Sequence, residues 1–465
     1  MQDSTSRAAG RWWTQKRWWV AIMLCAVTTI GYVDRNAMAV AAPLIRRQFG
    51  LTNEEYGQIG FAFLLAYAIG QLLLGPVIDR LGSKRSFRLA VLWWSVASML
   101  HALGRGVGSF FAARALLGIT EAANFPAAYK VIAEWFPRHE RSLASGFVTA
   151  GPGLGAIIAP PLIAFLIGTF DALHAAGLSP VHGWQAAFIV PGALGFLWIW
   201  IWQRHFHLPE ADPHISASER ALLLADRTPP ADDEGQRQAG PLLDELAAYF
   251  HRLRYWIRYR EVWGLVLARF TADGAFYFFI FWIPNYLSDV RQFGLWEIAI
   301  AAAIPFVFAD AGGLFGGWLG QRLIRGGRSV DASRKLMIWS GALLVPLALP
   351  AVYVDSATIA VLCMGLGIFA IQMKAASLFA VPGDIVPPHA VGTVWGVSGA
   401  AGSIAAAFSQ PVIGWTIDHF SYEPVFIAVS LMHIISAAMI SVFIRRIEPI
   451  RLRSPAPQER LEARP

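Results

Sequence analysis

Cysteine and charge are both scarce in this chain of 465 residues. Only Cys25 and Cys363 occur, each inside an apolar stretch, which excludes a disulfide framework and a multi-cysteine metal site. Charged residues make up 15% of the sequence, against about 25% in an average soluble domain. Catalytic motifs of the H-E-x-x-H or G-x-S-x-G kind do not occur either. We therefore expect no enzyme, no bound metal and no cofactor.

Apolar residues dominate instead, at 56% of the chain with a mean hydropathy of +0.48. They form stretches close to the ~20 residues that a helix needs to cross the hydrocarbon of a bilayer. These stretches lie at about 18–43, 57–78, 86–104, 108–132, 142–169, 184–205, 261–287, 296–320, 335–354, 357–382, 392–416 and 423–444. We expect an all-α polytopic membrane protein with about twelve transmembrane helices.

A polar gap divides these stretches into two sets. The sequence predicts an N-terminus at 1–17, an N-terminal six-helix half at 18–205, a linker at 206–258, a C-terminal six-helix half at 259–446 and a tail at 447–465. A short surface helix is expected in the linker near Leu242–Tyr259. Gly75-x-x-x-Asp79-Arg80 after the second span has a degenerate counterpart, Gly317-x-x-x-Gln321-Arg322, after the eighth. This repetition indicates pseudo-symmetric halves.

The positions of the basic residues predict the orientation of the chain. On one side of the membrane the short loops hold only Arg46, Arg47, Arg105 and Arg291. On the other side they hold Arg80, Lys84, Arg85, Arg138, Arg141, Arg322, Arg325, Arg328 and Arg334, besides the basic termini. The positive-inside rule then places both termini and the linker in the cytoplasm of a cell (inner) membrane. Basic residues confined to loops are no nucleic-acid footprint, so we expect the lipid bilayer and a small substrate as partners.

Two spans carry charges at membrane depth. Asp34 and Arg35 lie in the first span, while Arg114 and Glu121 lie two helical turns apart on one face of the fourth. Each such charge costs roughly 2.5–3.5 kcal/mol on insertion scales, so it normally faces a protein interior or a water-filled path. Arginines suit a carboxylate substrate, and acids whose pKa responds to desolvation suit proton exchange. A purely structural pairing of these charges is the alternative.

The loop after the second span has the sharpest motif. Its G-x-x-x-D-R-x-G-x-K-R pattern resembles the loop signature of the major facilitator superfamily, and it is filled at every position by Gly75, Asp79, Arg80, Gly82, Lys84 and Arg85. The resemblance implies a two-half major facilitator fold, in which these residues act as a conformational latch. Glycines allow the tight turn that such a loop needs.

Further motifs resemble the anion:cation symporter branch of that family, and within it bacterial hexuronate or sugar-acid transporters. They are Tyr32-x-Asp34-Arg35, the fourth-span run Arg114…Glu121…Asn124-Phe125-Pro126, and FYFFIFWIPNYL at 276–287. The resemblance implies import of an organic anion by proton symport through alternating access, in a monomer with H+ as the coupling ion. A carboxylate exchanger or facilitator is the alternative, and a membrane sensor without flux is a more distant one.

In this interpretation Arg35 and Arg114 hold the anion, and Asp34 and Glu121 exchange protons. Tyr67 in the second span can donate a hydroxyl group to the same substrate. Tyr32 is assigned to the substrate as well, although it could equally be an ordinary packing aromatic.

The tenth span departs from the family pattern. Hexuronate-type spans resemble H-Q-G-W-S-A-N-L-F, whereas this chain reads I-Q-M-K-A-A-S-L-F at 371–379. We assign Gln372, Lys374 and Ser377 to substrate binding. A third cation at Lys374 indicates a dicarboxylate or an aromatic acid, unless Lys374 snorkels to the interface or pairs with Asp384 or Asp310. Near other span ends, His101, His182 and His419 lack metal-ligand spacing and are expected to be solvated.

Overall fold

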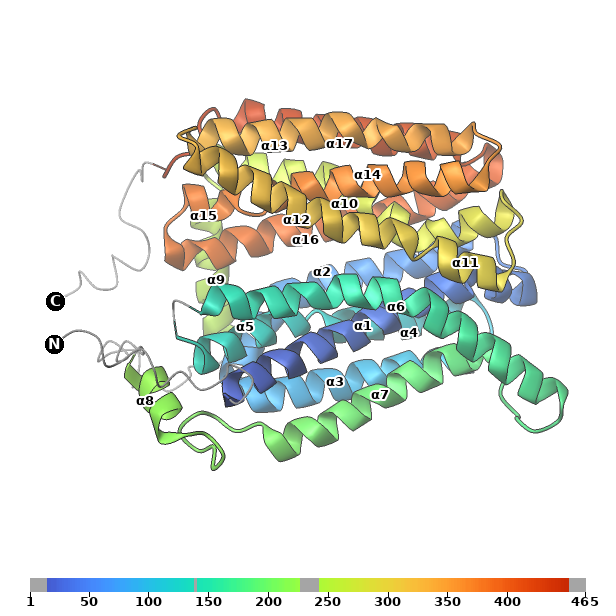
Figure 1. Ribbon diagram of the computed structural model, residues 1–465, viewed down its shortest axis with the longest axis horizontal. Coiled ribbons are helices and arrows are strands. Elements are labelled where there is room, and N and C mark those ends of the chain that lie inside the picture. The colour runs from blue at the N-terminus through green and yellow to red at the C-terminus, as the bar shows by residue number, and fades with distance from the viewer. Residues whose placement is uncertain (1–14, 138–139, 226–241, 451–465) are drawn as a thin grey trace.

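The computed structural model describes residues 15–137, 140–225 and 242–450, and it is helical throughout these ranges. Figure 1 shows long helices that run roughly parallel to one another. The first group comprises α1 (Lys16–Phe49), α2 (Asn53–Leu81), α3 (Ser83–Leu100), α4 (Val107–Glu121), α5 (Asn124–Trp135), α6 (Arg141–Ala175) and α7 (Gly183–His205). Two linker helices follow, α8 (Ala217–Ala225) and α9 (Leu242–Trp256). The linker was expected to hold only the second of these.

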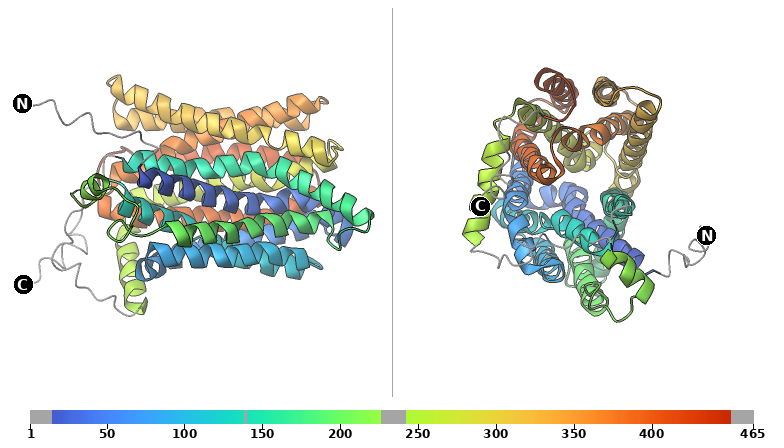
Figure 2. Two further views of the ribbon diagram at one scale, coloured as in Figure 1. Left: turned by 60° about the horizontal axis from the view of Figure 1, so that its bottom comes forward. Right: turned by 90° about the vertical axis from the view of Figure 1, so that its left-hand side faces the viewer.

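The second group begins at α10 and contains eight α-helices and a 3-10 helix. They are α10 (Arg260–Asp289), α11 (Leu295–Ala301), α12 (Ile304–Arg325), α13 (Val330–Leu344), η3 (Val345–Val352), α14 (Ala357–Leu378), α15 (Val381–Ile385), α16 (Pro388–His419) and α17 (Glu423–Phe443). Figure 2 shows the two groups end-on, with α1–α7 in blue to green and α10–α17 in yellow to red.

Among the described residues, ten helical segments are long and apolar enough to cross a membrane. Two further spans, formed by α1 and by the helix pair α4–α5, carry the four charges that the sequence placed at membrane depth. The ten and these two make twelve, so the predicted all-α membrane fold is confirmed. Several helices exceed their predicted spans: the 34 residues of α1 measure about 51 Å, against about 30 Å of hydrocarbon.

Proline explains why the fourth span is broken. Pro126 has no N–H to donate to the carbonyl of Ala122, and its ring would clash with that carbonyl. The chain therefore leaves α4 after Glu121 and enters α5 at Asn124. Pro382 has the same relation to Leu378, the last residue of α14. The fourth membrane span of each group is thus divided into two helices, α4 and α5 in the first group and α14 and α15 in the second.

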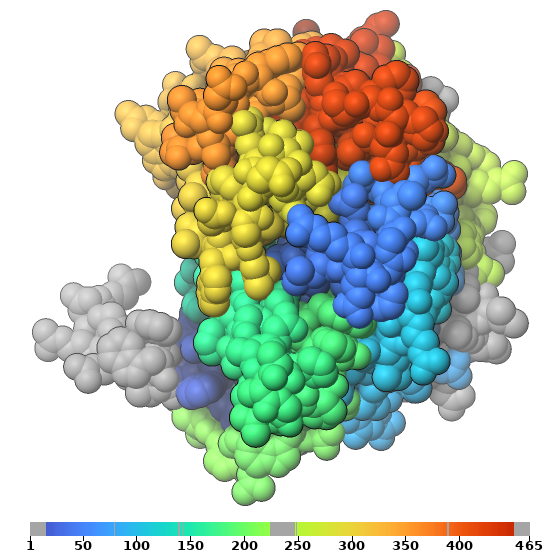
Figure 3. All heavy atoms as spheres, turned by 90° about the vertical axis from the view of Figure 1, so that its right-hand side faces the viewer, coloured from blue at the N-terminus to red at the C-terminus, as the bar shows by residue number. Residues whose placement is uncertain are grey.

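Polar contacts join the two groups at one end of the bundle, which we call the far side because it lies opposite α9 and the start of α1 (Figure 1). Arg46 pairs with Asp289 at 2.9 Å, and the Asp418 carboxylate accepts hydrogen bonds from Asn53 Nδ2 at 2.7 Å and Glu54 N at 2.9 Å. Figure 3 looks onto this face, where the α1–α2 turn in blue lies against the second group. We call the opposite end, with Lys16 and α9, the termini side.

Helices α2 and α16 make the closest approach between the groups, near the far side. A Cβ on Gly57 would collide with the carbonyl of Gln410, and one on Gly414 with the carbonyl of Asn53. The two backbones touch because glycine leaves no side chain between them. Towards the termini side, Ser403 Oγ of α16 donates to Gln71 Oε1 of α2 at 3.3 Å, and α9 lies across both helices (Figure 1).

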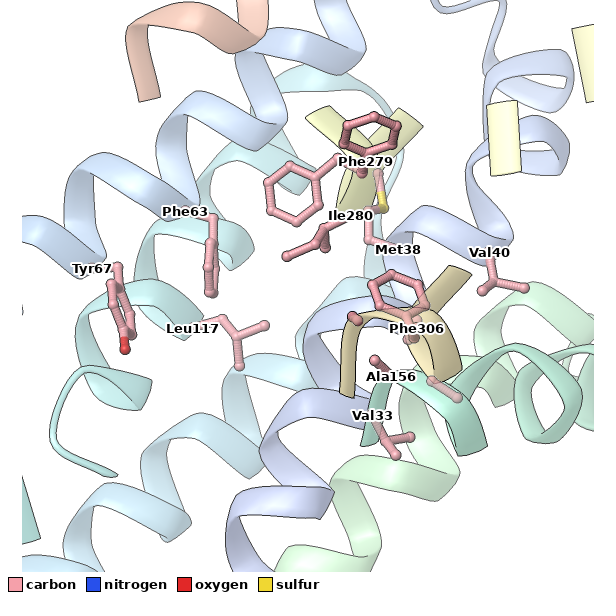
Figure 4. Packing of buried hydrophobic residues seen from close by; sticks show 14 of the residues in the cluster. Val33, Met38, Val40, Phe63, Tyr67, Leu117, Ala156, Phe279, Ile280 and Phe306 are labelled. Carbon is pink, nitrogen blue, oxygen red and sulfur yellow. The ribbon is translucent and has the colours of Figure 1, made fainter. Parts of the chain in front are cut away.

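Apolar side chains fill the space between the groups. Figure 4 shows Phe63 and Leu117 of the first group facing Ile280 and Phe279 of α10, with Phe306 of α12 beside α1 and α6. These side chains are buried in one continuous cluster that spans both groups. The charged residues of α1 and α4 therefore lie inside protein rather than facing lipid.

Candidate functional site

The centre of the site is an ion pair between the first and fourth spans. Arg35 of α1 donates from Nη2 at 2.8 Å and from Nε at 3.1 Å to a single oxygen of Glu121, Oε2. Both side chains are 3% exposed. The other oxygen, Oε1, is buried and has no hydrogen-bond partner. Glu121 is the last residue of α4, so the proline-induced break fixes where its carboxylate lies.

Aromatic rings surround the Arg35 guanidinium. It lies 4.4 Å from the ring centre of Tyr32 and 4.9 Å from those of Phe63 and Tyr67. Cation–π contacts of this kind stabilise a desolvated cation by ~2 kcal/mol. The predicted substrate residues Tyr32 and Tyr67 therefore do lie beside Arg35, one helical turn from it on α1 and across from it on α2.

Arg114 lies next to this pair and retains free hydrogen-bonding capacity. Its Nη2 donates to the backbone carbonyl of Arg35 at 3.2 Å, and its Nη1 is buried without a partner. The guanidinium lies 5.5 Å from the ring centre of Phe63. A desolvated N–H left unpaired costs roughly 1–3 kcal/mol, so this atom is suited to an acceptor that is absent from the protein itself.

Asp34 faces away from Arg35, towards α3 and α7. Ser98 Oγ donates to Asp34 Oδ1 at 2.7 Å, while Oδ2 is buried without a partner. His101, one turn further along, directs Nδ1 to the carbonyls of Ala97 (2.8 Å) and Ser98 (3.1 Å). Its ring stacks on Phe188 and is fully buried. The expectation that His101 is solvated was therefore wrong, because α3 continues inside the bundle up to this residue.

A small cavity lies beside the Arg35–Glu121 pair, with about 10 Å³ open to the centre of a water-sized sphere, which is room for about one water molecule. Its lining comes from α1, α2, α3, α4 and α5: Gly31, Tyr32, Arg35, Tyr67, Trp94, Glu121, Asn124 and Phe125. Four of these residues were predicted from the sequence as site residues. Trp94 was missed, because an apolar span with adjacent tryptophans gives no sign of which ring points inward.

Lys374 lies in a separate polar cluster inside the second group. Its Nζ donates to Ser436 Oγ at 2.7 Å and to the His433 carbonyl at 3.2 Å, and lies 3.3 Å from His433 Nδ1. Ser436 Oγ in turn donates to the carbonyl of Ala268 on α10. Lys374 is 1% exposed, so the expectation of snorkelling was wrong.

The acids proposed as partners of Lys374 lie elsewhere. Asp384 pairs with Arg334 at 3.0 Å. The carboxylate of Asp310 occupies the space that a Cβ on Gly153 of α6 would need. A third acid, Asp273, accepts from Arg269 at 2.8 Å one turn away on α10. Both proposed pairings of Lys374 were therefore wrong, and its ammonium is held by uncharged groups.

The other second-half assignments are not joined to the cavity. Gln372 is half-buried, and Ser377 is buried with its hydroxyl oxygen unpartnered. Neither residue lines the cavity around Arg35, and neither does Lys374. Their assignment to the substrate stays a prediction.

The predicted latch loop forms the turn between α2 and α3. Gly82 adopts a φ of 74°, which a residue with a Cβ rarely does, so the glycine there meets a backbone requirement. Ser83 Oγ donates to Glu134 of α5 at 2.6 Å, and the Lys84 carbonyl accepts from Trp202 Nε1 at 3.2 Å. The side chain of Asp79 lies outside the described residues. The latch role of Gly75, Asp79, Arg80, Gly82, Lys84 and Arg85 stays a prediction.

A helical membrane bundle that buries a small charged cavity at the meeting point of several helices is the architecture of a membrane transporter rather than of an enzyme. The chain belongs to the Major Facilitator Superfamily, whose family model matches residues 24–409. The protein is an integral membrane protein and a transporter of this superfamily.

Comparison with known proteins narrows the relationship. The chain is 30% identical over 448 residues to the hexuronate transporter of Escherichia coli strain K12, covering 95% of this chain and 98% of that one. It is 33% identical over 332 residues to the galacturonate transporter of Dickeya chrysanthemi, covering 71% and 89%. A crystal structure of a bacterial homologue of the human lysosomal transporter Spinster, inward-facing and occupied, shares the fold with a TM-score of 0.69 at 19% identity, covering 92% and 95%.

Proposed function

We propose that the protein imports an organic anion, a hexuronate or a related sugar acid, together with protons. Relatives named as hexuronate and galacturonate transporters support the substrate class. The charged cluster beside the cavity supports the coupling. In this proposal the protein works as a monomer in the inner membrane, with both termini in the cytoplasm.

The balance of buried charge is the observation that carries the proposal. The buried cluster contains two guanidiniums, Arg35 and Arg114, and two carboxylates, Asp34 and Glu121, and all four side chains are at most 3% exposed. The cluster is neutral when both acids are ionised. A substrate carboxylate adds a negative charge, and an uncompensated charge in a dry interior is very costly. Uptake of one proton restores neutrality, so anion and proton enter together.

Glu121 is the acid best placed to take that proton. It occupies Arg35 with one oxygen only, so an incoming carboxylate that binds Arg35 competes directly with it. Two buried atoms beside this ion pair have no hydrogen-bond partner, Nη1 of Arg114 and Oε1 of Glu121. Once displaced, Glu121 loses its cation and gains a proton, while Arg114 supplies a second donor to the substrate. Asp34, held by Ser98, offers a second proton site.

Alternating access then requires the two groups of helices to rock about the cavity. The bonds from Arg46 to Asp289 and from Asn53 to Asp418 hold the far side together. With the termini side in the cytoplasm, these bonds would close this state to the outside. Rupture of the far-side contacts and closure at the latch loop would give the opposite state.

Transport by purified protein in vesicles tests the proposal, with galacturonate, galactonate and galactarate tested in parallel. An inward pH gradient should drive accumulation by the wild type, and substrate addition should alkalinise the outside. Glu121→Gln should lose accumulation but keep substrate exchange, because a neutral side chain there mimics the protonated carrier. Asp355→Asn, at an exposed loop position, serves as the control and should behave as wild type.

Binding should also depend on pH, since a proton enters with the anion. In the range where the coupling acid is ionised, affinity should fall by up to about tenfold for each unit of rising pH. Glu121→Gln should flatten that profile. A wild type that exchanges substrate without moving protons would instead be an exchanger or facilitator. A Glu121→Gln variant that still accumulates substrate would remove Glu121 from the coupling role.

A further inference from the structure

We infer that Trp94 and Asn124 form a hydroxyl-recognition site in the cavity beside Arg35, which makes the transporter selective for polyhydroxy carboxylates over carboxylates without hydroxyl groups. This inference rests on the proposed function, because it names the part of the substrate that the charged cluster does not read. Neither residue belongs to the arginine–carboxylate cluster.

Trp94 lines the cavity and has an unused hydrogen-bond donor. Its side chain on α3 is fully buried and lines the cavity, and its indole N–H has no partner. By contrast, the indoles of Trp198, Trp202 and Trp282 donate to Met23, Lys84 and Gln410. Trp135 and Trp184 also lack a partner, but they do not line this cavity. An indole nitrogen can only donate, so Trp94 requires an acceptor there.

Asn124 places an unused acceptor at the same cavity. Its Nδ2 donates to Thr28 Oγ1 at 3.2 Å, and that hydroxyl already donates to the Leu24 carbonyl at 2.9 Å. Thr28 therefore has no proton to give, and the amide of Asn124 must turn its nitrogen towards it. This leaves Asn124 Oδ1 buried, without a partner and restricted to accepting.

A sugar hydroxyl satisfies both atoms, because it accepts one hydrogen bond and donates another. The carboxylate of the same substrate would bind Arg35, which lines the cavity with them. A hydroxyl-free acid would leave both polar atoms desolvated and unpaired, which a site of this kind disfavours strongly.

Binding by the purified full-length protein tests the assignment without any pH gradient. We would measure affinities for galacturonate and for cyclohexanecarboxylate, which has a ring and a carboxylate but no hydroxyl group. The variant Trp94→Phe keeps a ring and removes the donor, and Asn124→Ala removes the acceptor. The control is Trp93→Phe, because Trp93 is the neighbouring indole, 51% exposed on the outer surface of the helix bundle. The melting temperature of each variant without ligand reports folding.

We expect the wild type to prefer galacturonate by at least about a hundredfold. Trp94→Phe should weaken galacturonate binding about tenfold and leave cyclohexanecarboxylate unchanged, with the same pattern for Asn124→Ala. Trp93→Phe should change neither affinity.

The inference would be overturned if both variants weakened the binding of the two ligands equally, or changed neither affinity. It would also be overturned if the wild type bound no hydroxylated acid. If Glu121→Gln still accumulates substrate while Trp94→Phe lowers the preference for galacturonate over cyclohexanecarboxylate, the symport proposal alone is rejected. If Glu121→Gln loses accumulation while Trp94→Phe leaves that preference unchanged, the hydroxyl site alone is rejected.

Discussion

The fourth helices of the two halves break at equivalent places but carry different chemistry. Counted back seven residues from the break, α4 has Arg114 before its terminal Glu121, whereas α14 has Ile371 before its terminal Leu378. The cation of α14, Lys374, lies four residues before the end and contacts α17. The break in the fourth span therefore places a charged residue, Glu121, beside the cavity in the first half, and an apolar residue, Leu378, at the same position in the second.

Hydrogen bonding separates the two clusters further. Arg114, Glu121 and Asp34 each keep one buried polar atom without a partner. Lys374 has three polar neighbours, which match the three N–H groups of an ammonium. Buried polar atoms with unused hydrogen-bonding capacity suit a site that binds and releases a ligand, whereas fully hydrogen-bonded groups suit a structural role. We therefore expect the ligand and proton chemistry of the proposed mechanism to lie in the first half, and Lys374 to have a structural role in the second.

The largest expected effect is at Arg114. Arg114→Ala leaves two buried acids against one guanidinium, and breaking a buried charge pair costs about 3–5 kcal/mol. We expect loss of substrate binding by more than about a hundredfold, measured as the ligand-induced rise in melting temperature. Arg105→Ala, at an exposed arginine on the far side, is the control. Arg114→Lys should retain fold and part of the binding. Wild-type affinity in Arg114→Ala would place the anion elsewhere.

Lys374→Gln tests the other side of the comparison. The substitution removes a hydrogen-bonded ammonium, so thermal stability should drop by the equivalent of about 1–3 kcal/mol. Substrate affinity should stay within about threefold of wild type, since effects at separated sites add independently. Loss of binding on the scale expected for Arg114→Ala would return Lys374 to the substrate site and favour a dianionic substrate.

A methyl group can probe how tightly the second-half ion pair is packed. A Cβ on Gly402 of α16 would collide with the Asp273 carboxylate, whereas a Cβ on Gly313 of α12 would meet open space. Gly402→Ala should therefore lower the melting temperature, at a cost of about 1–3 kcal/mol, because the Arg269–Asp273 pair must shift. Gly313→Ala should be neutral or raise the melting temperature. Equal melting temperatures for the two variants would show that this pair yields freely.

The smallest effect on substrate affinity is expected at the far side. Asp418→Ala removes the acceptor of three hydrogen bonds from Asn53 and Glu54, each worth about 1 kcal/mol. The equilibrium should shift towards states that are open on the far side, with substrate affinity little changed. Labelling of a cysteine introduced at Gln58 by an impermeant thiol reagent would report the shift. Unchanged labelling would show that the glycine contact alone holds this side closed.

Much of the fold was predictable because a bilayer imposes length and apolarity on its helices. The approximate positions of the spans, their number and the turn at Gly82 all follow from hydropathy and glycine placement. The helix α8 was not predicted, since it lies in a polar segment where its contacts are distant: Glu219 accepts from Arg17 Nη1 of α1 at 3.1 Å. The sequence of a polar linker does not indicate which distant residues it will contact.

The site divides in the same way. Charges inside apolar spans drew attention to Arg35, Arg114, Asp34 and Glu121, because a charge at membrane depth is costly unless it faces a protein interior or a water-filled path. Orientation within a helix was not predictable for Trp94, since Trp93 and Trp94 have the same chemistry and differ only in which neighbour each faces. For Lys374 the sequence offered candidate acids, but its partners proved to be uncharged groups on α17, and only the packing of helices decides that.

The glycine contact between α2 and α16 makes a lever of α2. From Gly57 to Asn53 the helix measures about 6 Å, and from Gly57 to Gln71 about 21 Å, at 1.5 Å per residue. The contact runs from Asn53 to Gly57, because the Asn53 carbonyl lies against Gly414. If α2 tilts about this end as a rigid rod, a given rotation moves Gln71 farther than any residue nearer the contact. In the proposed transport cycle, a small tilt at the far side would therefore become a wider movement towards the termini side.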